Sequence, residues 1–483
     1  STIVIARGLG ANDYGIYVFL LASFIAIKSL LDMGTSNAFY TFISKSAHSR
    51  AFYLYYIIWV FFQFILSVMI IFLLLPDNWI ERIWNGVEES RIALAFVAVF
   101  MQQQVWQLVS QIGESARLTI KVQTLNILTA ILHLSVISIL HAFGLLTIER
   151  IYIVIMLEIL IASIAAYFLL SVEYKNERFS FNDLIHKYWI YCMPLIPYMW
   201  LVMIMKFSDT WFLQRYGGAI EQGNYAISTR FATASLVVTT AIIRILWKEV
   251  SAQSNGKDTD KTFSYYDKAS RILFVFSAFT ACFFIPWVPD LIINLLGEEY
   301  TDGMIVMSLM FLYPIHQSLA QVNSTVYYSL SLTCQFVLIN SAQIIVATLV
   351  MYSLLAPKEA FIPGLELGSF GLAIKMVGVQ FLGVNFSMWW LARKLGWKYS
   401  ILPQLSAIVS FLLISYLVHF ITNDSYYLSV NFIIKVTVSG VLYLIMGVVL
   451  LRYFPASIGM SPGEFQKYIK MTGNLLSKPF KRI

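Results

Sequence analysis

The chain has 483 residues, of which 59% are hydrophobic and only 12% are charged, and its formal net charge is +7. Soluble domains carry about 25% charged residues, so the composition excludes a soluble globular enzyme and indicates a polytopic membrane protein. Apolar runs of about 20 residues, the length that crosses a bilayer as a helix, recur from end to end between short loops.

The apolar runs predict an all-α fold of membrane-spanning helices. In the first half, helices are expected over residues 15–44, 52–75, 91–113, 122–143 and 151–172. In the second half, they are expected over residues 188–213, 223–250, 272–296, 303–330, 335–355 and 368–392. Two further helices are expected over residues 401–421 and 430–451, and residues 1–6 are expected to end a truncated first helix. The predicted domains are a first half at 1–172, a second half at 173–392, and two C-terminal helices with a basic tail at 393–483.

A short internal repeat relates the two six-helix halves. The sequence RGLGANDYGIY resembles RYGGAIEQGNY further along the chain, and one constant shift in numbering pairs Gly10 with Gly218 and Gly15 with Gly223. Because an even number of predicted helices separates the copies, the halves should share one orientation and be related by an axis along the membrane normal, a layout found among secondary transporters. Chance matching between apolar segments is the alternative.

Lys and Arg side chains collect in alternate loops, which assigns those loops to the cytoplasm by the positive-inside rule. The loops that contain Lys121, Lys187 and Lys398 belong to this set, as does the C-terminal tail. Both copies of the repeat then lie in outer loops, and the C-terminus is cytoplasmic. Since the positive charge reflects topology, no nucleic-acid partner is expected.

Two stretches carry a resemblance to a known family. ARGLGANDYGIYVFL, followed by Asp32, Met33 and Gly34, is similar to the N-terminal signature of the polysaccharide flippases that move lipid-linked oligosaccharides such as O-antigen units. MPLIPYMWLVMIMKFSDTWFLQRYGGAIEQGNYAISTRFA is similar to the helix pair that opens the second half in that family. The resemblance covers essentially the whole chain. It implies the multidrug, oligosaccharidyl-lipid and polysaccharide exporter superfamily and a bacterial cytoplasmic (inner) membrane location.

Charged side chains inside predicted helices are the first candidate site residues. A Lys, Arg or Asp at a helix centre costs about 2.5–3.5 kcal/mol on insertion scales, so such residues normally face a cavity or a partner. Lys28 and Asp32 are four positions apart, and Lys206 and Asp209 are three apart, so each pair shares a helical face. Either each pair neutralises itself and joins helices, or the cations bind an anionic headgroup while the acids tune them or exchange H+ or Na+.

Arg230 and Lys375 have no acid three or four positions away in the sequence. They are therefore the better candidates for contact with the pyrophosphate of a substrate. An acid on another helix, such as Glu158, could instead pair with either cation or take part in ion coupling.

Amide side chains form a second pattern. Gln103, Gln107 and Gln111 recur at helical spacing in the first half, and Gln317 and Gln321 do so in the corresponding helix of the second half. Amides within a membrane most often bridge helices. The alternative is that these two stripes form the polar wall of a cavity that binds sugars.

The search for catalytic patterns is negative. The sequence contains no phosphate-binding loop with the Gly-x-x-x-x-Gly-Lys pattern, no His-Glu-x-x-His pair and no clustered metal-ligand spacing. Cys192, Cys282 and Cys334 are far apart in apolar surroundings. We therefore expect no enzyme activity, catalytic residue, metal or cofactor.

Three functions compete at this level. A flippase for an undecaprenyl-pyrophosphate-linked oligosaccharide, working by alternating access, fits the basic residues within the helices. Its partners would be the lipid-linked oligosaccharide, the bilayer, H+ or Na+ as a coupling ion, and glycan polymerase or assembly proteins. A drug/cation antiporter of the same superfamily should instead offer dominant acidic groups. A membrane oligosaccharide polymerase or ligase should carry a large outer loop, whereas the predicted outer loops are short.

Overall fold

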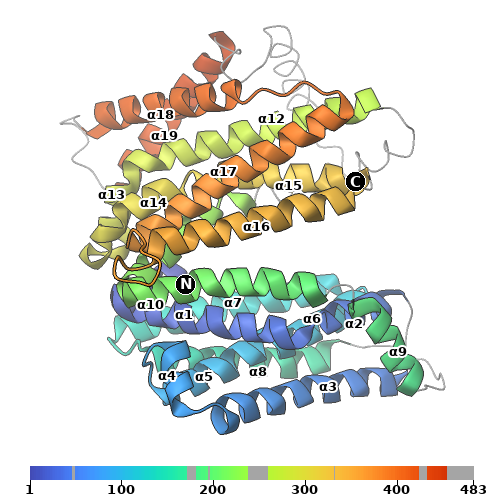
Figure 1. The fold of residues 1–483 in the computed structure, drawn as a ribbon. Coiled ribbons are helices and arrows are strands. Elements are labelled where there is room, and N and C mark those ends of the chain that lie inside the picture. Colours follow the sequence, from blue (N-terminus) through green and yellow to red (C-terminus); the bar gives the residue numbers. More distant parts are fainter. Residues whose placement is uncertain are drawn as a thin grey trace. The chain divides into compact units, whose positions relative to one another are not determined.

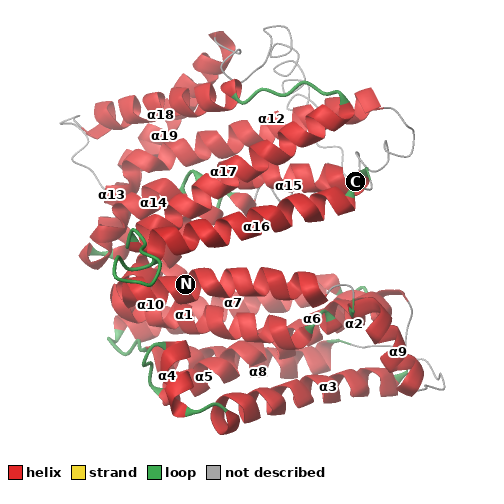
Figure 2. Ribbon diagram, viewed as in Figure 1, coloured by secondary structure: helices red, strands yellow, loops and turns green. Residues whose placement is uncertain are grey.

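The structure, a computed structural model, describes residues 1–45, 49–170, 181–193, 196–237, 259–330, 332–423 and 432–453. Within these ranges the regular elements are all helices and no strand occurs (Figure 2). Eleven helices in the described ranges are long and apolar enough to cross a membrane. The predicted class, an all-α polytopic membrane protein, is confirmed.

The chain divides into two compact units, of which the first contains residues 1–223 and 355–368. Its α-helices are α1 (Thr2–Asp32), α2 (Thr35–Lys45), α3 (Arg50–Met69), α4 (Asp77–Trp84), α5 (Glu89–Phe100), α6 (Trp106–Ser115), α7 (Thr119–Ala142), α8 (Ile148–Leu169), α9 (Phe181–Cys192) and most of α10 (Ile196–Thr233), all labelled in Figure 1. Two π-helices, η1 (Ile70–Leu74) and η2 (Met101–Val105), follow α3 and α5.

The second unit contains residues 224–354 and 369–483. After the end of α10 it comprises α12 (Thr259–Phe284), η3 (Ile285–Trp287), α13 (Val288–Leu291), η4 (Ile292–Leu296), η5 (Glu298–Gly303), α14 (Met304–Met310), α15 (Tyr313–Ser329), α16 (Thr333–Leu355), α17 (Gly368–Leu395), α18 (Leu402–Asn423) and α19 (Phe432–Tyr453). Its main core packs α12, α15, α17 and α18 together around buried side chains that include Leu273, Val322, Leu391 and Phe411.

The helix predicted over residues 15–44 is interrupted in the structure. Met33 has φ 46° and Gly34 has φ 83°, so both adopt left-handed backbone that cannot continue a right-handed helix. The prediction of one continuous helix was therefore wrong, because a long apolar run hides a two-residue break. The predicted helix 303–330 is likewise divided, between α14 and α15.

The helix predicted over residues 188–213 also differs. Its first turn belongs to the separate helix α9, which ends at Cys192, and α10 begins at Ile196. Pro197 lies in the first turn of α10, where proline is tolerated because that N–H has no partner within the helix. The helix predicted over 272–296 starts earlier, since α12 begins at Thr259. Residues 223–233 of the helix predicted over 223–250 belong to α10, and residues 238–250 lie outside the described residues.

The two copies of the repeat adopt the same backbone conformation. Gly10 has φ 75° and ψ 171° within α1, and Gly218 has φ 82° and ψ −177° within α10, and at each glycine two helical segments meet across a kink. These positive φ values explain why glycine is required at both places. The numbering shift found in the sequence thus pairs residues of equivalent structure.

Candidate functional site

A polar cluster surrounds the break between α1 and α2. Lys28 Nζ donates a hydrogen bond to Gln107 Oε1 at 3.0 Å and lies 3.8 Å from Asp32 Oδ2. The predicted Lys28–Asp32 pair therefore exists, and the structure adds Gln107 from α6 as its third member. Asp32 is only 2% exposed, so its carboxylate must find its partners within the protein.

Asp32 caps the start of α2. Its Oδ1 accepts hydrogen bonds from the Ser36 backbone N–H and the Thr35 hydroxyl, both at 3.0 Å, and its Oδ2 accepts one from the Ser36 hydroxyl at 2.7 Å. Such a cap satisfies backbone donors that the helix itself leaves unpaired. Trp59 Nε1 on α3 in turn donates to Thr35 Oγ1 at 3.1 Å, which extends the cluster to a fourth helix. The sequence spacing gave no indication of this capping role.

A second chain of amides reaches the same break. Gln104 Nε2 donates to Gln63 Oε1 at 2.9 Å, and Gln63 Nε2 donates to the Leu31 carbonyl oxygen at 3.0 Å. Gln104 is 3% exposed, whereas the predicted Gln103 is only partly buried. Gln104 stands three positions before Gln107, a spacing that also places the two on one helical face, so the sequence did contain a signal for it. Gln63 is on another helix, and no local spacing relates it to this stripe.

Glu158 has a partner within the first unit. Its Oε2 lies 2.9 Å from Nδ1 of His133 on α7, and the Glu158 side chain is buried. The sequence analysis considered Glu158 as a partner for Arg230 or Lys375. This contact instead joins α7 to α8 through a Glu–His pair. The two residues are 25 positions apart, so no local sequence pattern could predict this contact.

The second unit contains a cavity of about 250 Å³ lined by polar side chains. The predicted Gln317 and Gln321 of α15 both line it, so the structure brings these two residues together. The other lining residues come from α15, α16 and α17 and are Ala320, Asn323, Ser324, Phe336, Asn340, Gln343, Gln380, Gly383, Val384 and Ser387. The lining contains amides and hydroxyls but no charged side chain.

Hydrogen bonds hold part of this amide cavity in place. Gln380 Nε2 donates to Gln317 Oε1 at 2.7 Å, and Asn323 Nδ2 donates to Ser387 Oγ at 2.7 Å. The buried Oε1 of Gln321 and Oδ1 of Asn323 have no protein partner. Both oxygens are acceptors, so a ligand that brings hydroxyl donors would satisfy groups that the protein alone leaves unpaired.

The remaining predicted residues lie on α6, α10 and α17. Lys206 is exposed and Asp209 is partly buried on the first-unit part of α10, and Arg230 is exposed near the end of that helix in the second unit. Lys375 on α17 is 3% exposed, with its Nζ 3.9 Å from Met376 Sδ. Gln111, on α6, is partly buried. Across the described residues, no group of three or more His, Cys, Asp or Glu side chains could hold a metal ion.

No protein-family model matches the sequence, and no curated protein matches it. Solved structures do match. The chain is similar to the lipid II flippase MurJ in an inward closed conformation, with a TM-score of 0.64, 16% identity and coverage of 93% of this chain and 95% of that one.

Two transporters of the MOP superfamily, the multidrug, oligosaccharidyl-lipid and polysaccharide exporters, also match. An inward-facing multidrug resistance MATE transporter gives a TM-score of 0.62 at 13% identity, covering 81% of this chain and 93% of that one. A transporter from Pyrococcus furiosus, whose binding pocket is described as having reverse polarity, gives 0.52 at 15% identity, covering 82% and 91%. The chain therefore has the fold of the MOP-superfamily transporters.

Proposed function

We propose that the protein moves a lipid-linked oligosaccharide from the cytoplasmic to the outer leaflet of a bacterial cytoplasmic membrane by alternating access. The observation that carries the proposal is the amide cavity between α15, α16 and α17. Sugar hydroxyls both donate and accept hydrogen bonds, so they match a lining of amides and hydroxyls. The unpartnered oxygens of Gln321 and Asn323 would then find donors on the substrate.

The charged residues within the helices support the same class of substrate. Lys375 and Lys28 are cations removed from bulk water, and with Lys206 and Arg230 they would stabilise the pyrophosphate as it leaves the interfacial water. We assign Lys375 and Arg230 first to the headgroup, because neither has an acid three or four positions away in the sequence, whereas Lys28 pairs with Asp32.

A drug/cation antiporter is the alternative with the same fold, as the MATE transporter shows. Such a protein needs a carboxylate that can meet a cationic drug or a coupling ion. In the first unit, Asp32 accepts three hydrogen bonds as a helix cap and Glu158 contacts His133. These contacts favour structural roles for Asp32 and Glu158. Asp209, on α10, is the third acid that the sequence proposes for coupling to H+ or Na+.

Gene deletion in the host tests the proposal. Lipid-linked oligosaccharide should accumulate inside, assembled glycan should disappear outside, and a full-length copy should reverse both changes. Normal levels of both pools would overturn the flippase proposal and favour a drug exporter. Units that cross the membrane but fail to polymerise would instead favour a polymerase.

A variant series then tests the amide cavity itself. Gln343→Leu and Gln380→Leu each remove an amide from the cavity wall, while Gln335→Leu, on the same helix α16 but outside the cavity, is the matched control. With about 1 kcal/mol per lost hydrogen bond, each cavity variant should slow transport about fivefold. Equal transport by all three variants would remove the cavity from the mechanism.

A further inference from the structure

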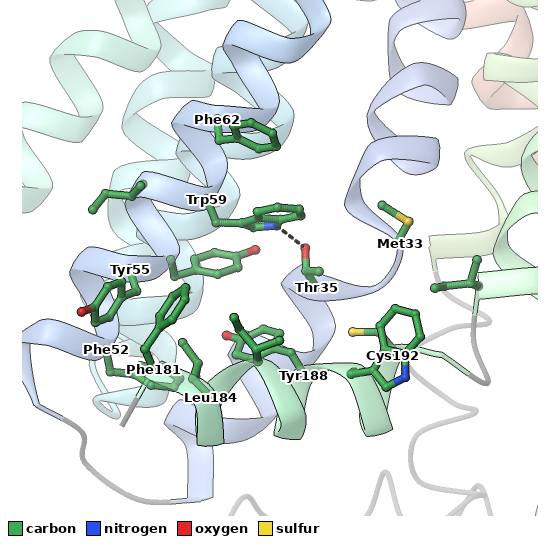
Figure 3. Close-up of a pocket in the computed structure, with 15 residues that line it drawn as sticks. Met33, Thr35, Phe52, Tyr55, Trp59, Phe62, Phe181, Leu184, Tyr188 and Cys192 are labelled. Carbon is green, nitrogen blue, oxygen red and sulfur yellow. Dashed lines mark hydrogen bonds between the residues drawn. The ribbon is translucent and has the colours of Figure 1, made fainter. Parts of the chain in front are cut away.

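An apolar groove of about 590 Å³ lies in the first unit, between α3 and α9 and beside the break that precedes α2 (Figure 3). Its lining is almost entirely apolar or aromatic, and Thr35 and the ring edges of Tyr and Trp residues supply the few polar atoms. Several of its large side chains are well exposed, including Ile58, Phe62 and Trp189. An exposed apolar surface of this extent needs a hydrocarbon partner.

Helix α9 forms one wall of the groove with a single face. Its lining residues follow helical spacing and are Phe181, Leu184, Ile185, Tyr188, Trp189 and Cys192. Asp183, His186 and Lys187 are exposed and lie outside the lining. This division is typical of an amphipathic helix that lies in the membrane interface with its apolar face toward the lipid chains.

Aromatic contacts fix α9 against the neighbouring helices. The rings of Phe181 and Tyr55 are 5.3 Å apart, and those of Tyr188 and Phe42 are 5.1 Å apart. The hydroxyls of Tyr191 and Thr41 lie 3.1 Å from each other. Because α2 and α3 both hold α9 along its length, the groove is a formed feature of the first unit.

Basic residues lie on the helices beside the groove, two of them at the end where α2 finishes and α3 begins. Lys45 ends α2 and Arg50 begins α3, two residues before the lining residue Phe52, while Lys187 precedes the lining residue Tyr188. The positive-inside rule predicts that this end faces the cytoplasm. A long apolar chain that ends in phosphate is complementary to such a site, since its tail matches the groove and its anionic end matches the basic residues.

The groove is also continuous with the polar cluster. Thr35 lines the groove (Figure 3). At the same time its hydroxyl donates to Asp32, which pairs with Lys28. The groove therefore meets charged groups of the transporter at its Thr35 end, one length of α2 away from Lys45. This continuity favours the transported lipid over an unrelated phospholipid.

On the basis of the proposed function, we propose that this groove is the loading site for the polyisoprenyl tail of the lipid-linked substrate. The phosphate of the substrate then lies at Lys45, Arg50 and Lys187. The site holds the lipid at the cytoplasmic side before the sugars enter the amide cavity. The tail is thus recognised by the first unit and the sugars by the second.

Photocrosslinking tests this assignment on the purified full-length protein. The probe is a polyprenyl phosphate with a diazirine in its chain, and crosslinks should map to α3 and α9. Unlabelled polyprenyl phosphate should compete, whereas equal amounts of polyprenol or phosphatidylglycerol should compete at least about tenfold less well. Equal competition by phosphatidylglycerol would show an ordinary lipid groove, and equal competition by polyprenol would remove the basic residues from the site.

Two isoleucines of α9 supply matched variants. Ile185 lines the groove and is 50% exposed, while Ile190 does not line it and is 61% exposed. Ile185→Trp should fill the groove and lower crosslinking about tenfold, and Ile190→Trp should leave it unchanged. Unchanged crosslinking in a folded Ile185→Trp protein would overturn the proposal. If that variant fails to fold, Trp189→Ser against Ile190→Ser provides the same comparison.

Failure of this inference can be distinguished from failure of the proposed function. Gln343→Leu should slow transport but leave crosslinking of the tail intact. Specific crosslinking with normal transport in all amide variants would retain the groove and reject the amide cavity. Absent crosslinking with transport lost in the amide variants would retain the cavity and reject the groove.

Discussion

Gly15 packs directly against the carbonyl oxygen of Ala219, and a Cβ atom at Gly15 would overlap it. The reciprocal contact is also present, since a Cβ atom at Gly223 would overlap the carbonyl oxygen of Ala11. The shift that pairs Gly15 with Gly223 also pairs Ala11 with Ala219. The two copies of the repeat therefore pack against each other symmetrically. In each copy, the glycine contacts the backbone carbonyl oxygen of the alanine in the other copy.

Gly15→Ala and Gly223→Ala should each destabilise the protein. The added methyl group meets backbone, which cannot move aside as a side chain can, and overpacking of this kind costs about 1–3 kcal/mol or more. Gly378→Ala is the matched control, because a Cβ atom there meets nothing within 4 Å on helix α17. Thermal unfolding in detergent should show a lower Tm for the first two variants only. An unchanged Tm for both would contradict the close contact.

Asp32→Leu should destabilise α2 by about 1–2 kcal/mol, because it removes the acceptor for Thr35 and Ser36. Asp32→Asn keeps a side-chain oxygen for the Ser36 N–H and should unfold close to wild type. We expect this variant to retain transport, since the contacts of Asp32 are those of a cap. Loss of transport in folded Asp32→Asn protein would instead assign the carboxylate to ion coupling. Thermal unfolding and vesicle transport separate the two outcomes.

His133→Leu should destabilise the first unit strongly, because it leaves Glu158 buried beside an apolar side chain. Loss of one partner of a buried pair costs about 3–5 kcal/mol, whereas replacement of both partners by apolar residues is often tolerated. The double variant His133→Leu/Glu158→Leu should therefore be more stable than His133→Leu alone. A double-mutant cycle on Tm measures this coupling. Additive losses would show that the two side chains do not interact.

Gly383→Ala should narrow the amide cavity. A Cβ atom there would overlap the side-chain amide of Gln343, which is flexible and can move into the cavity. We expect the protein to fold and to transport about fivefold more slowly, the effect of about 1 kcal/mol. Transport by the Gly378→Ala control should be unaffected. A folded Gly383→Ala protein with full transport would show that substrate does not use this part of the cavity.

The sequence alone predicted the all-α membrane fold and the paired glycines of the repeat. Both follow from local properties, because a bilayer requires long apolar helices and a positive φ requires glycine. It also paired Lys28 with Asp32 and placed Gln317 and Gln321 on one helical face, since residues three or four positions apart in a helix are neighbours.

Only the tertiary structure showed the contacts between helices. Gln107 joins Lys28, His133 joins Glu158, and Gln380 joins Gln317, although each pair is distant in the chain. The sequence also did not predict the helix break at Met33 or the π-helix before Trp106. A hydrophobic run has the same composition with or without an irregular turn. Which polar side chains face one another depends on how the helices pack and rotate, and that is decided by the whole core.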